Sequence, residues 1–170
     1  TLSGKGHEAM FWRLSIVDQL GGKQPMIDKE RKVTLLFNGE VYNYKEIRQK
    51  LKAKNAQFKT DSDTEVVLKA YLEWGADCFS FFEGMFAICI LDELKDELLL
   101  ARDCLGVKPL YYKEGDGGLV VASEQKSLLA YFDDGAELDR SSFSNYMLFQ
   151  TVPDTKTLFQ GISKVIPGYA

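Results

Sequence analysis

The segment from Gly84 to Asp92 constrains the fold most, because every residue between its two ends is apolar. A strand as uniformly apolar as this is expected to be covered on both faces. A charged turn over residues 93–96 leads to a second strand, Glu97 to Arg102, and so short a turn pairs the two strands antiparallel. The chain is therefore expected to build stacked sheets.

Helical patterns lie before and after these strands. Apolar residues at helical spacing predict helices over Tyr44–Lys54, Thr64–Trp74, Glu124–Phe132 and Asp139–Phe149. Further strands are expected at Phe11–Val17, Lys32–Phe37, Gly106–Tyr112 and Gly118–Ser123. Thr1–Glu8 is polar and is expected to be a loose end. Sheets with helices on both sides indicate an α+β layered sandwich.

Composition narrows the class of protein. With 170 residues, of which 45% are apolar, the chain can bury one sizeable core, so a single domain over residues 1–170 is expected. The net charge of −4 without a basic stripe argues against a nucleic-acid partner. No apolar run has membrane-spanning length. Three scattered cysteines without metal-ligand spacing favour a cytoplasmic protein with reduced thiols and no metal site.

The tripeptide Asn38-Gly39-Glu40 is the main candidate for chemistry. It follows an apolar strand, and Asn-Gly is a strong turn signal, so we expect a turn here. A turn chosen only for its shape would also explain the tripeptide. Alternatively, the Asn38 carboxamide and the Gly39 N–H form an oxyanion site, and Glu40 binds an ammonium group.

Two charged residues elsewhere allow similar alternatives. Arg13 is the one charge in an apolar strand, so it either reaches solvent at a sheet edge or binds an anion. Asp63 precedes a helix, where it either caps the helix or binds a ligand, and Ser62 competes with it for the capping role.

An ordered set of motifs resembles the glutamine-hydrolysing domain of asparagine synthetases. The matching stretches run from Arg13-Leu-Ser-Ile-Val-Asp18 to Pro167-Gly168, nearly the whole chain. Between these ends lie Gln24-Pro-Met26, Phe37-Asn-Gly-Glu-Val-Tyr-Asn-Tyr44, Ser62-Asp-Thr-Glu-Val66, Gly84-Met-Phe-Ala87, Ala101-Arg-Asp103, Gly106-Val-Lys-Pro-Leu-Tyr-Tyr112, Ala122-Ser-Glu124 and Thr157-Leu-Phe-Gln-Gly-Ile162.

The resemblance implies an N-terminal-nucleophile hydrolase-like fold, a four-layer αββα sandwich of two antiparallel sheets that here lacks its leading strands. It implies that a cysteine at the mature N-terminus attacks the glutamine amide. Carried over by motif, Arg13 grips the α-carboxylate of L-glutamine, and Glu40 and Asp63 hold its ammonium. Asn38 and Gly39 form the oxyanion hole, and Leu14, Ile16 and Val17 supply pocket backbone.

The same resemblance implies partners outside this sequence. Ammonia would pass to a C-terminal synthetase domain that uses ATP and Mg2+ to amidate aspartate, and that domain is absent after Ala170. The glutaminase domain itself implies no cofactor. Related synthetases amidate acceptors other than aspartate, so the acceptor stays open.

Departures from the family pattern leave alternatives. Only twelve residues precede Arg13, none is a cysteine, and Phe11-Trp12 replaces the family's His-Arg. The chain is therefore either part of an active amidotransferase, or a domain that has lost catalysis and serves structure or glutamine binding, as in β-lactam synthetases. A third interpretation makes Thr1 the nucleophile. The chain alone is expected to be inactive, and its unpaired strand edges to favour homodimers or aggregates.

Overall fold

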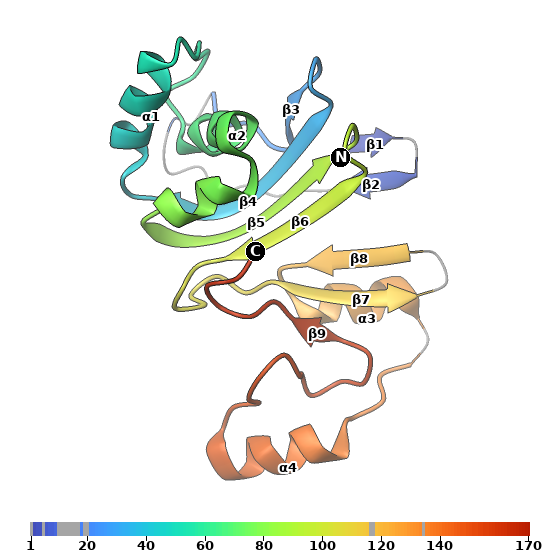
Figure 1. Cartoon of the computed structure of the whole chain (residues 1–170). Coiled ribbons are helices and arrows are strands. Elements are labelled where there is room, and N and C mark those ends of the chain that lie inside the picture. Colours follow the sequence, from blue (N-terminus) through green and yellow to red (C-terminus); the bar gives the residue numbers. More distant parts are fainter. Residues whose placement is uncertain (1, 5, 10–17, 19–20, 116–117, 134) are drawn as a thin grey trace. The chain divides into compact units, whose positions relative to one another are not determined.

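The computed structural model describes residues 2–4, 6–9, 18, 21–115, 118–133 and 135–170. The chain forms two compact units, one comprising residues 1–101 with Ala170 and the other residues 102–169 (Figure 1). None of the described helices is long and apolar enough to cross a membrane. Whether residues 1–170 act as one domain stays a prediction.

The first unit contains a four-stranded sheet in the order β3-β4-β5-β6. Its strands are β3 (Met26–Asp28), β4 (Val33–Val41), β5 (Gly84–Asp92) and β6 (Glu97–Arg102). β5 and β6 have the predicted bounds. β4 pairs antiparallel with β5 over its full length, from Val33 opposite Asp92 to Val41 opposite Gly84. This long ladder is the frame on which the candidate site lies.

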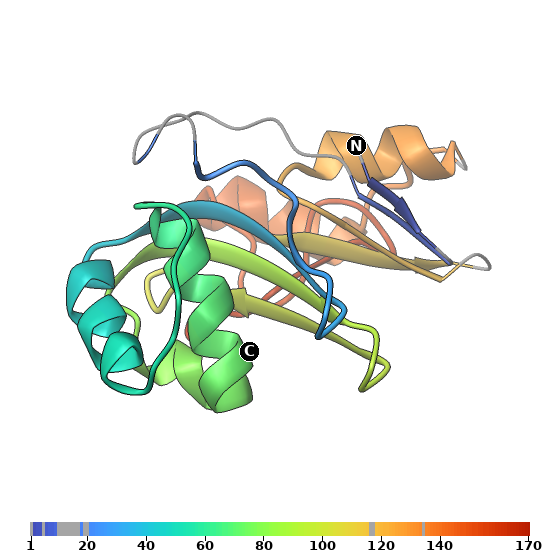
Figure 2. The same ribbon diagram turned by 90° about the horizontal axis from the view of Figure 1, so that it is seen from above.

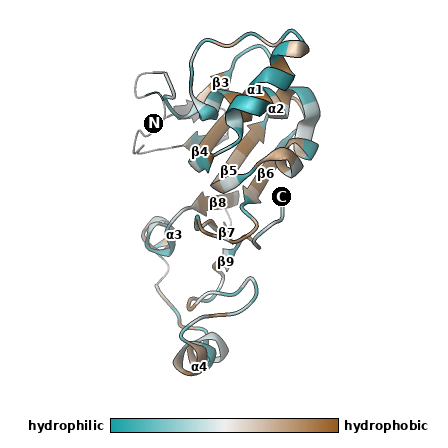
Figure 3. Cartoon of the chain, turned by 90° about the vertical axis from the view of Figure 1, so that its left-hand side faces the viewer, coloured by the Kyte–Doolittle hydropathy of each residue, from teal (hydrophilic) through white to brown (hydrophobic). Residues whose placement is uncertain are grey.

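Helices cover one face of this sheet (Figure 2). They are α1 (Tyr44–Ala53), α2 (Asp63–Trp74) and the 3-10 helix η1 (Gly75–Phe81). Figure 3 shows that β4 and β5 are the hydrophobic centre of this layer. Alternate residues of the two strands are buried against the helices, together with residues of α1 and α2: Val33, Leu35, Phe37, Ile47, Leu51, Val66, Val67, Ala70, Tyr71, Phe86, Ile88 and Ile90.

The bounds of α1 and α2 confirm the predicted helices to within one residue. Ser62 caps α2, because its hydroxyl accepts a hydrogen bond from the Glu65 N–H at 3.2 Å. Gly75 ends the helix with a φ of 61°. Asp63 is therefore the first helical residue and is free of the capping role.

The prediction of a loose N-terminal end was wrong for the residues that the structure describes. β1 (Leu2–Gly4) and β2 (His7–Ala9) pair antiparallel, with Gly4 opposite His7. Gly6 in the connection has a φ of 83°, which glycine adopts without steric cost. The strand predicted at Phe11–Val17 lies outside the described residues.

The second unit contains a three-stranded sheet in the order β8-β7-β9. Its strands are β7 (Tyr111–Gly115), β8 (Gly118–Ala122) and β9 (Ser163–Lys164). Two helices, α3 (Gln125–Phe132) and α4 (Arg140–Phe149), lie between β8 and β9 in the chain. α3 packs on β7, where the Lys113 ammonium lies 4.5 Å from the centre of the Phe132 ring. The predicted helices are confirmed.

The strand predicted from Gly106 was too long at its start, because residues 106–110 form a loop. The buried carboxylate of Asp103 accepts hydrogen bonds from the N–H groups of Leu105, Val107 and Lys108, at 2.9 to 3.2 Å. N–H groups captured in this way cannot join a ladder. The strand therefore starts only at Tyr111.

Arg102 organises the same part of the second unit. Its guanidinium donates to three backbone carbonyls, those of Lys108 at 2.7 Å, Val165 at 3.0 Å and Gly106 at 2.6 Å. The motifs Ala101-Arg-Asp103 and Gly106-Val-Lys are thus explained by loop structure.

Candidate glutamine site

Asn38, Gly39 and Glu40 lie within β4, so the prediction of a turn at this tripeptide was wrong. They are opposite Ala87, Phe86 and Met85 of β5, and the turn comes only at residues 42 and 43. Gly39 instead allows β4 and β5 to approach closely. Gly39 has a φ of 134°, and a Cβ added there would lie 2.0 Å from the Met85 carbonyl oxygen.

A second glycine shows the same crowding from the partner strand. A Cβ added at Gly84 would lie 2.1 Å from the Glu40 carbonyl oxygen. Neither position accepts a side chain unless the backbone shifts. The two glycines therefore let β4 and β5 approach closely where the candidate residues lie.

Asp63 joins this strand end from the helical layer. Its Oδ2 accepts a hydrogen bond from the Val41 N–H at 3.3 Å, and its Oδ1 accepts one from the Thr64 N–H at 2.9 Å. The residue is only 4% exposed. Burial raises the pKa of its carboxyl above the usual value, and the negative charge of Glu40 raises this pKa further. Two interacting carboxylates favour a cationic group between them.

The Asn38 side chain is available to a ligand. Asn38 is half-buried and lies on the face of β4 opposite to the core residue Phe37. Within the described ranges, no hydrogen bond engages its carboxamide. The structure therefore brings Asn38, Gly39, Glu40 and Asp63 to one strand end. Arg13, Leu14, Ile16 and Val17 lie outside the described residues, so their predicted roles stay predictions.

None of the three cysteines has the setting of a nucleophile in the site. All three are free thiols. Burial raises the pKa of Cys78 and that of Cys89 to about 12, which suppresses the reactive thiolate. Cys104 is exposed and belongs to the second unit.

Gln24 contacts the strand just before the candidate residues, a role that was not predicted. Its Oε1 accepts a hydrogen bond from the Phe37 N–H at 2.6 Å, and its Nε2 donates to the Phe37 carbonyl at 2.7 Å. Because this contact depends on a partner 13 residues away, the Gln24-Pro25 pair carried no local signal for it.

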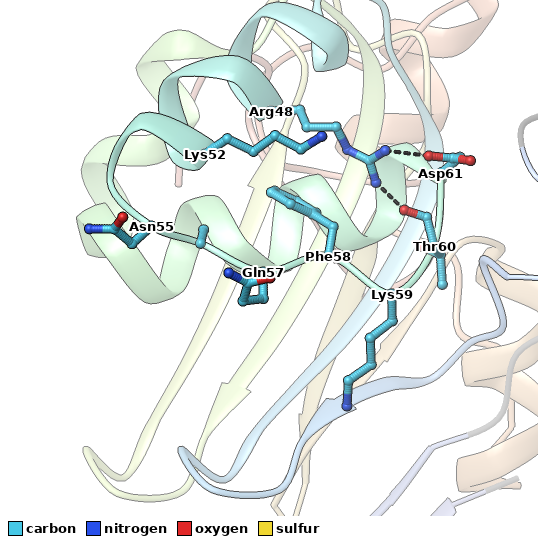
Figure 4. Close-up of a pocket in the computed structure, with 9 residues that line it drawn as sticks. Arg48, Lys52, Asn55, Gln57, Phe58, Lys59, Thr60 and Asp61 are labelled. Atoms are coloured by element: carbon cyan, nitrogen blue, oxygen red, sulfur yellow. Dashed lines mark hydrogen bonds and ion pairs between the residues drawn. The ribbon is translucent and has the colours of Figure 1, made fainter.

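A shallow pocket of about 440 Å³ lies elsewhere in the first unit, along the connection between α1 and α2 (Figure 4). Arg48 lines this pocket, and its guanidinium donates to Asp61 at 2.6 Å and to the Thr60 carbonyl. The same guanidinium lies 4.5 Å from the centre of the Phe58 ring. These contacts hold the connection against α1. Among the described candidates, neither Asp63 nor any residue of Asn38-Gly39-Glu40 lines this pocket.

The family is decided by comparison with protein-family models. Residues 4–170 match the model described as a glutamine amidotransferase domain. The chain belongs to this family. The match includes residues of both units, among them the strand end that carries Asn38.

Curated relatives of this amidotransferase domain are asparagine synthetases. It is 43% identical over 158 residues to asparagine synthetase [glutamine-hydrolyzing] 1 of Bacillus subtilis, covering 93% of this chain and 25% of that protein. It is 39% identical over 171 residues to asparagine synthetase [glutamine-hydrolyzing] 3 of the same organism, covering 96% and 28%. The domain thus spans little more than a quarter of the length of these relatives.

Solved structures confirm the α+β, N-terminal-nucleophile type of fold. The glutamine phosphoribosylpyrophosphate amidotransferase of B. subtilis has a TM-score of 0.54 and 23% identity, covering 85% of this chain and 28% of that chain. A structure described as the allosteric regulatory enzyme of purine biosynthesis has a TM-score of 0.59 and 23% identity, covering 92% and 31%. At this identity the likeness concerns the fold alone.

Proposed function

We propose that this amidotransferase domain is the glutaminase part of an asparagine synthetase. It would bind L-glutamine, hydrolyse the side-chain amide and release ammonia for the ATP- and Mg2+-dependent amidation of aspartate in a C-terminal synthetase domain. The observation that supports this most directly is that Asp63 bonds to the end of β4, next to Asn38, Gly39 and Glu40. The asparagine synthetases matched over nearly the whole chain support the choice of product.

The two carboxylates suit the α-ammonium of glutamine. Asp63 is buried, and the negative charge of Glu40 further raises the pKa of its carboxyl. An ammonium group placed near both would relieve this repulsion. Arg13 would bind the α-carboxylate at the other side, with Leu14, Ile16 and Val17 supplying backbone contacts.

Asn38 and Gly39 suit the reacting end of the substrate. When a thiolate attacks the side-chain amide, its carbon–oxygen double bond opens and negative charge develops on the oxygen. A carboxamide NH2 and a backbone N–H held by a rigid strand stabilise such a charge without reorganisation. The attacking thiolate would come from a cysteine at the mature N-terminus, because the pKa values of Cys78 and Cys89 are raised to about 12 and Cys104 belongs to the second unit.

The test assays the full-length gene product with glutamine and aspartate, with ammonia and aspartate, and with glutamine and a different acceptor. Glutamate release from glutamine, with asparagine formed only when ATP, Mg2+ and aspartate are present, is the expected result. If asparagine formed with ammonia as the nitrogen donor but not with glutamine, the domain would have lost glutamine hydrolysis. Amidation of another acceptor in place of aspartate would overturn the product while leaving the glutaminase role intact.

A further inference from the structure

Gln24 continues the pairing of β3 with β4 through its side chain. Met26 lies opposite Leu35 in an antiparallel register, so two residues further along, Gln24 falls opposite Phe37. The backbone ladder has ended there, and Pro25 has no N–H to contribute. The Gln24 carboxamide instead exchanges two hydrogen bonds with Phe37, at 2.6 and 2.7 Å, as a strand residue would.

This pairing reveals which backbone groups of β4 point away from β5. The N–H and C=O of Phe37 face Gln24, and alternate residues of a strand direct these groups to the same edge. The Val41 N–H agrees, because its acceptor is Asp63 rather than β5. Gly39 lies between these two residues, so the alternation of the strand directs its N–H to the same edge.

We infer that Gln24 is a positioning residue for the oxyanion site formed by Asn38 and Gly39. The Phe37 carbonyl that accepts from Gln24 Nε2 belongs to the planar peptide group that joins Phe37 to Asn38. Fixing this plane fixes the backbone from which the Asn38 side chain and the Gly39 N–H project. Gln24 thus holds this strand edge at Phe37, and Asp63 holds the same edge at Val41.

This role of Gln24 rests on the proposed glutaminase function. It predicts an effect on the position of the oxyanion donors and none on the binding of glutamine. The side-chain hydrogen bonds of Gln24 in the described part of the chain both go to the Phe37 backbone, so its loss should not weaken the binding of the charged ends of glutamine. It should instead misplace the oxyanion donors, and a displacement of about 1 Å can lower the rate roughly a hundredfold. The effect is expected in kcat rather than in KM.

The first experiment measures steady-state kinetics of the full-length protein carrying Gln24→Glu. This substitution keeps the shape and the acceptor but places a carboxylate against the Phe37 carbonyl, where Nε2 donated. We expect kcat with glutamine to fall at least about tenfold, KM to change less than about threefold, and ammonia-dependent activity to stay unchanged. Gln49→Glu is the matched control, because Gln49 is exposed on α1.

The second experiment measures amide hydrogen exchange of the same full-length protein carrying Gln24→Ala. The Phe37 N–H should exchange at least about tenfold faster than in the unsubstituted protein, since its acceptor is gone. Unchanged exchange at Phe37, unchanged kcat, or a parallel fall of ammonia-dependent activity would each overturn the role of Gln24. Absence of glutamate release by the unsubstituted protein would instead overturn the proposed function, and this role with it.

Discussion

The Tyr71 hydroxyl donates a hydrogen bond to Asp92 Oδ2 at 2.9 Å, which ties α2 to the end of β5. Burial pushes the pKa of Asp92 upward, but the Tyr71 hydroxyl and Lys95 outweigh it and hold this pKa below its usual value of 3.8. The interaction of Asp92 thus favours the ionised carboxylate in the folded state. Its contribution to stability depends on pH in a definite direction.

The first prediction follows from that direction. A carboxyl with a lowered folded pKa stabilises above its unfolded pKa and loses this contribution as pH falls through the folded value. The free energy of unfolding of the unsubstituted chain should therefore exceed that of Asp92→Asn at pH 6, and the difference should shrink below about pH 3.8. Urea unfolding at pH 6 and pH 3 measures it. Tyr71→Phe should show a smaller loss of stability on acidification than the unsubstituted chain.

Asp63 is predicted to act in the opposite direction. Its folded pKa is raised, mainly by burial and further by Glu40, so its contribution is present below its unfolded pKa and is lost as pH rises through the folded value. The stability of Asp63→Asn relative to the unsubstituted chain should therefore improve between pH 3 and pH 7. Urea unfolding across this range measures the trend. If the stability of Asp63→Asn relative to the unsubstituted chain fell between pH 3 and pH 7, the raised pKa would be contradicted.

Substitution of Gly39 should be among the most destabilising changes in the first unit. Gly39→Ala combines a positive φ with a contact of 2.0 Å to the Met85 carbonyl, so we expect a loss of about 4 kcal/mol or more. Gly118→Ala separates the two effects, because φ there is 116° but no atom lies within 4 Å of the added Cβ. It should lose about 1–3 kcal/mol. Equal losses in urea unfolding would show that strand approach at Gly39 is unimportant.

Glu65 is predicted to hold the connection before α2. Its carboxylate accepts from the Lys59 N–H and the Thr60 N–H at 2.6 to 3.1 Å, and from the Thr60 hydroxyl at 2.7 Å. Glu65→Gln should cost about 1.5–3 kcal/mol and speed amide exchange at Lys59 and Thr60. The control is Glu73→Gln, whose partly exposed ion pair with Lys54 should be worth less than about 1 kcal/mol.

Kinetics of the full-length protein should separate binding from chemistry. Arg13→Ala should raise KM for glutamine and leave kcat largely intact, because the α-carboxylate is charged in both ground and transition states. Asn38→Ala should lower kcat about a hundredfold with little change in KM, because the oxyanion develops only during attack. Both variants should keep ammonia-dependent activity. If Arg13→Ala lowered kcat with KM unmoved, the carboxylate role would be refuted.

Local patterns predicted those elements whose signals lie within a few residues. The apolar run of β5 and the charged turn after it gave correct bounds, and the cap Ser62 with the terminator Gly75 defined α2. The same reasoning placed Asn38, Gly39 and Glu40 in a turn. Gly is typical of turns, but at position 39 it is required because a Cβ would collide with the Met85 carbonyl, which lies on another strand.

The candidate site was predictable in its residue types more than in its geometry. Glu40 and Asp63 were assigned to one ligand group by family resemblance, and their electrostatic interaction is consistent with that assignment. The bond from Val41 to Asp63 spans 22 residues and that from Gln24 to Phe37 spans 13. Contacts of this kind depend on the packed fold, so neither spacing nor composition indicates them.

The three carbonyls that converge on Arg102 have a consequence for the order of folding. The Gly106 and Lys108 carbonyls lie within six residues of Arg102, whereas the Val165 carbonyl lies 63 residues away. Closing so long a loop costs more entropy and slows the step that depends on it. The loop after β6 can therefore form early, but the second unit reaches its final structure only when residue 165 has been synthesised and has reached this guanidinium.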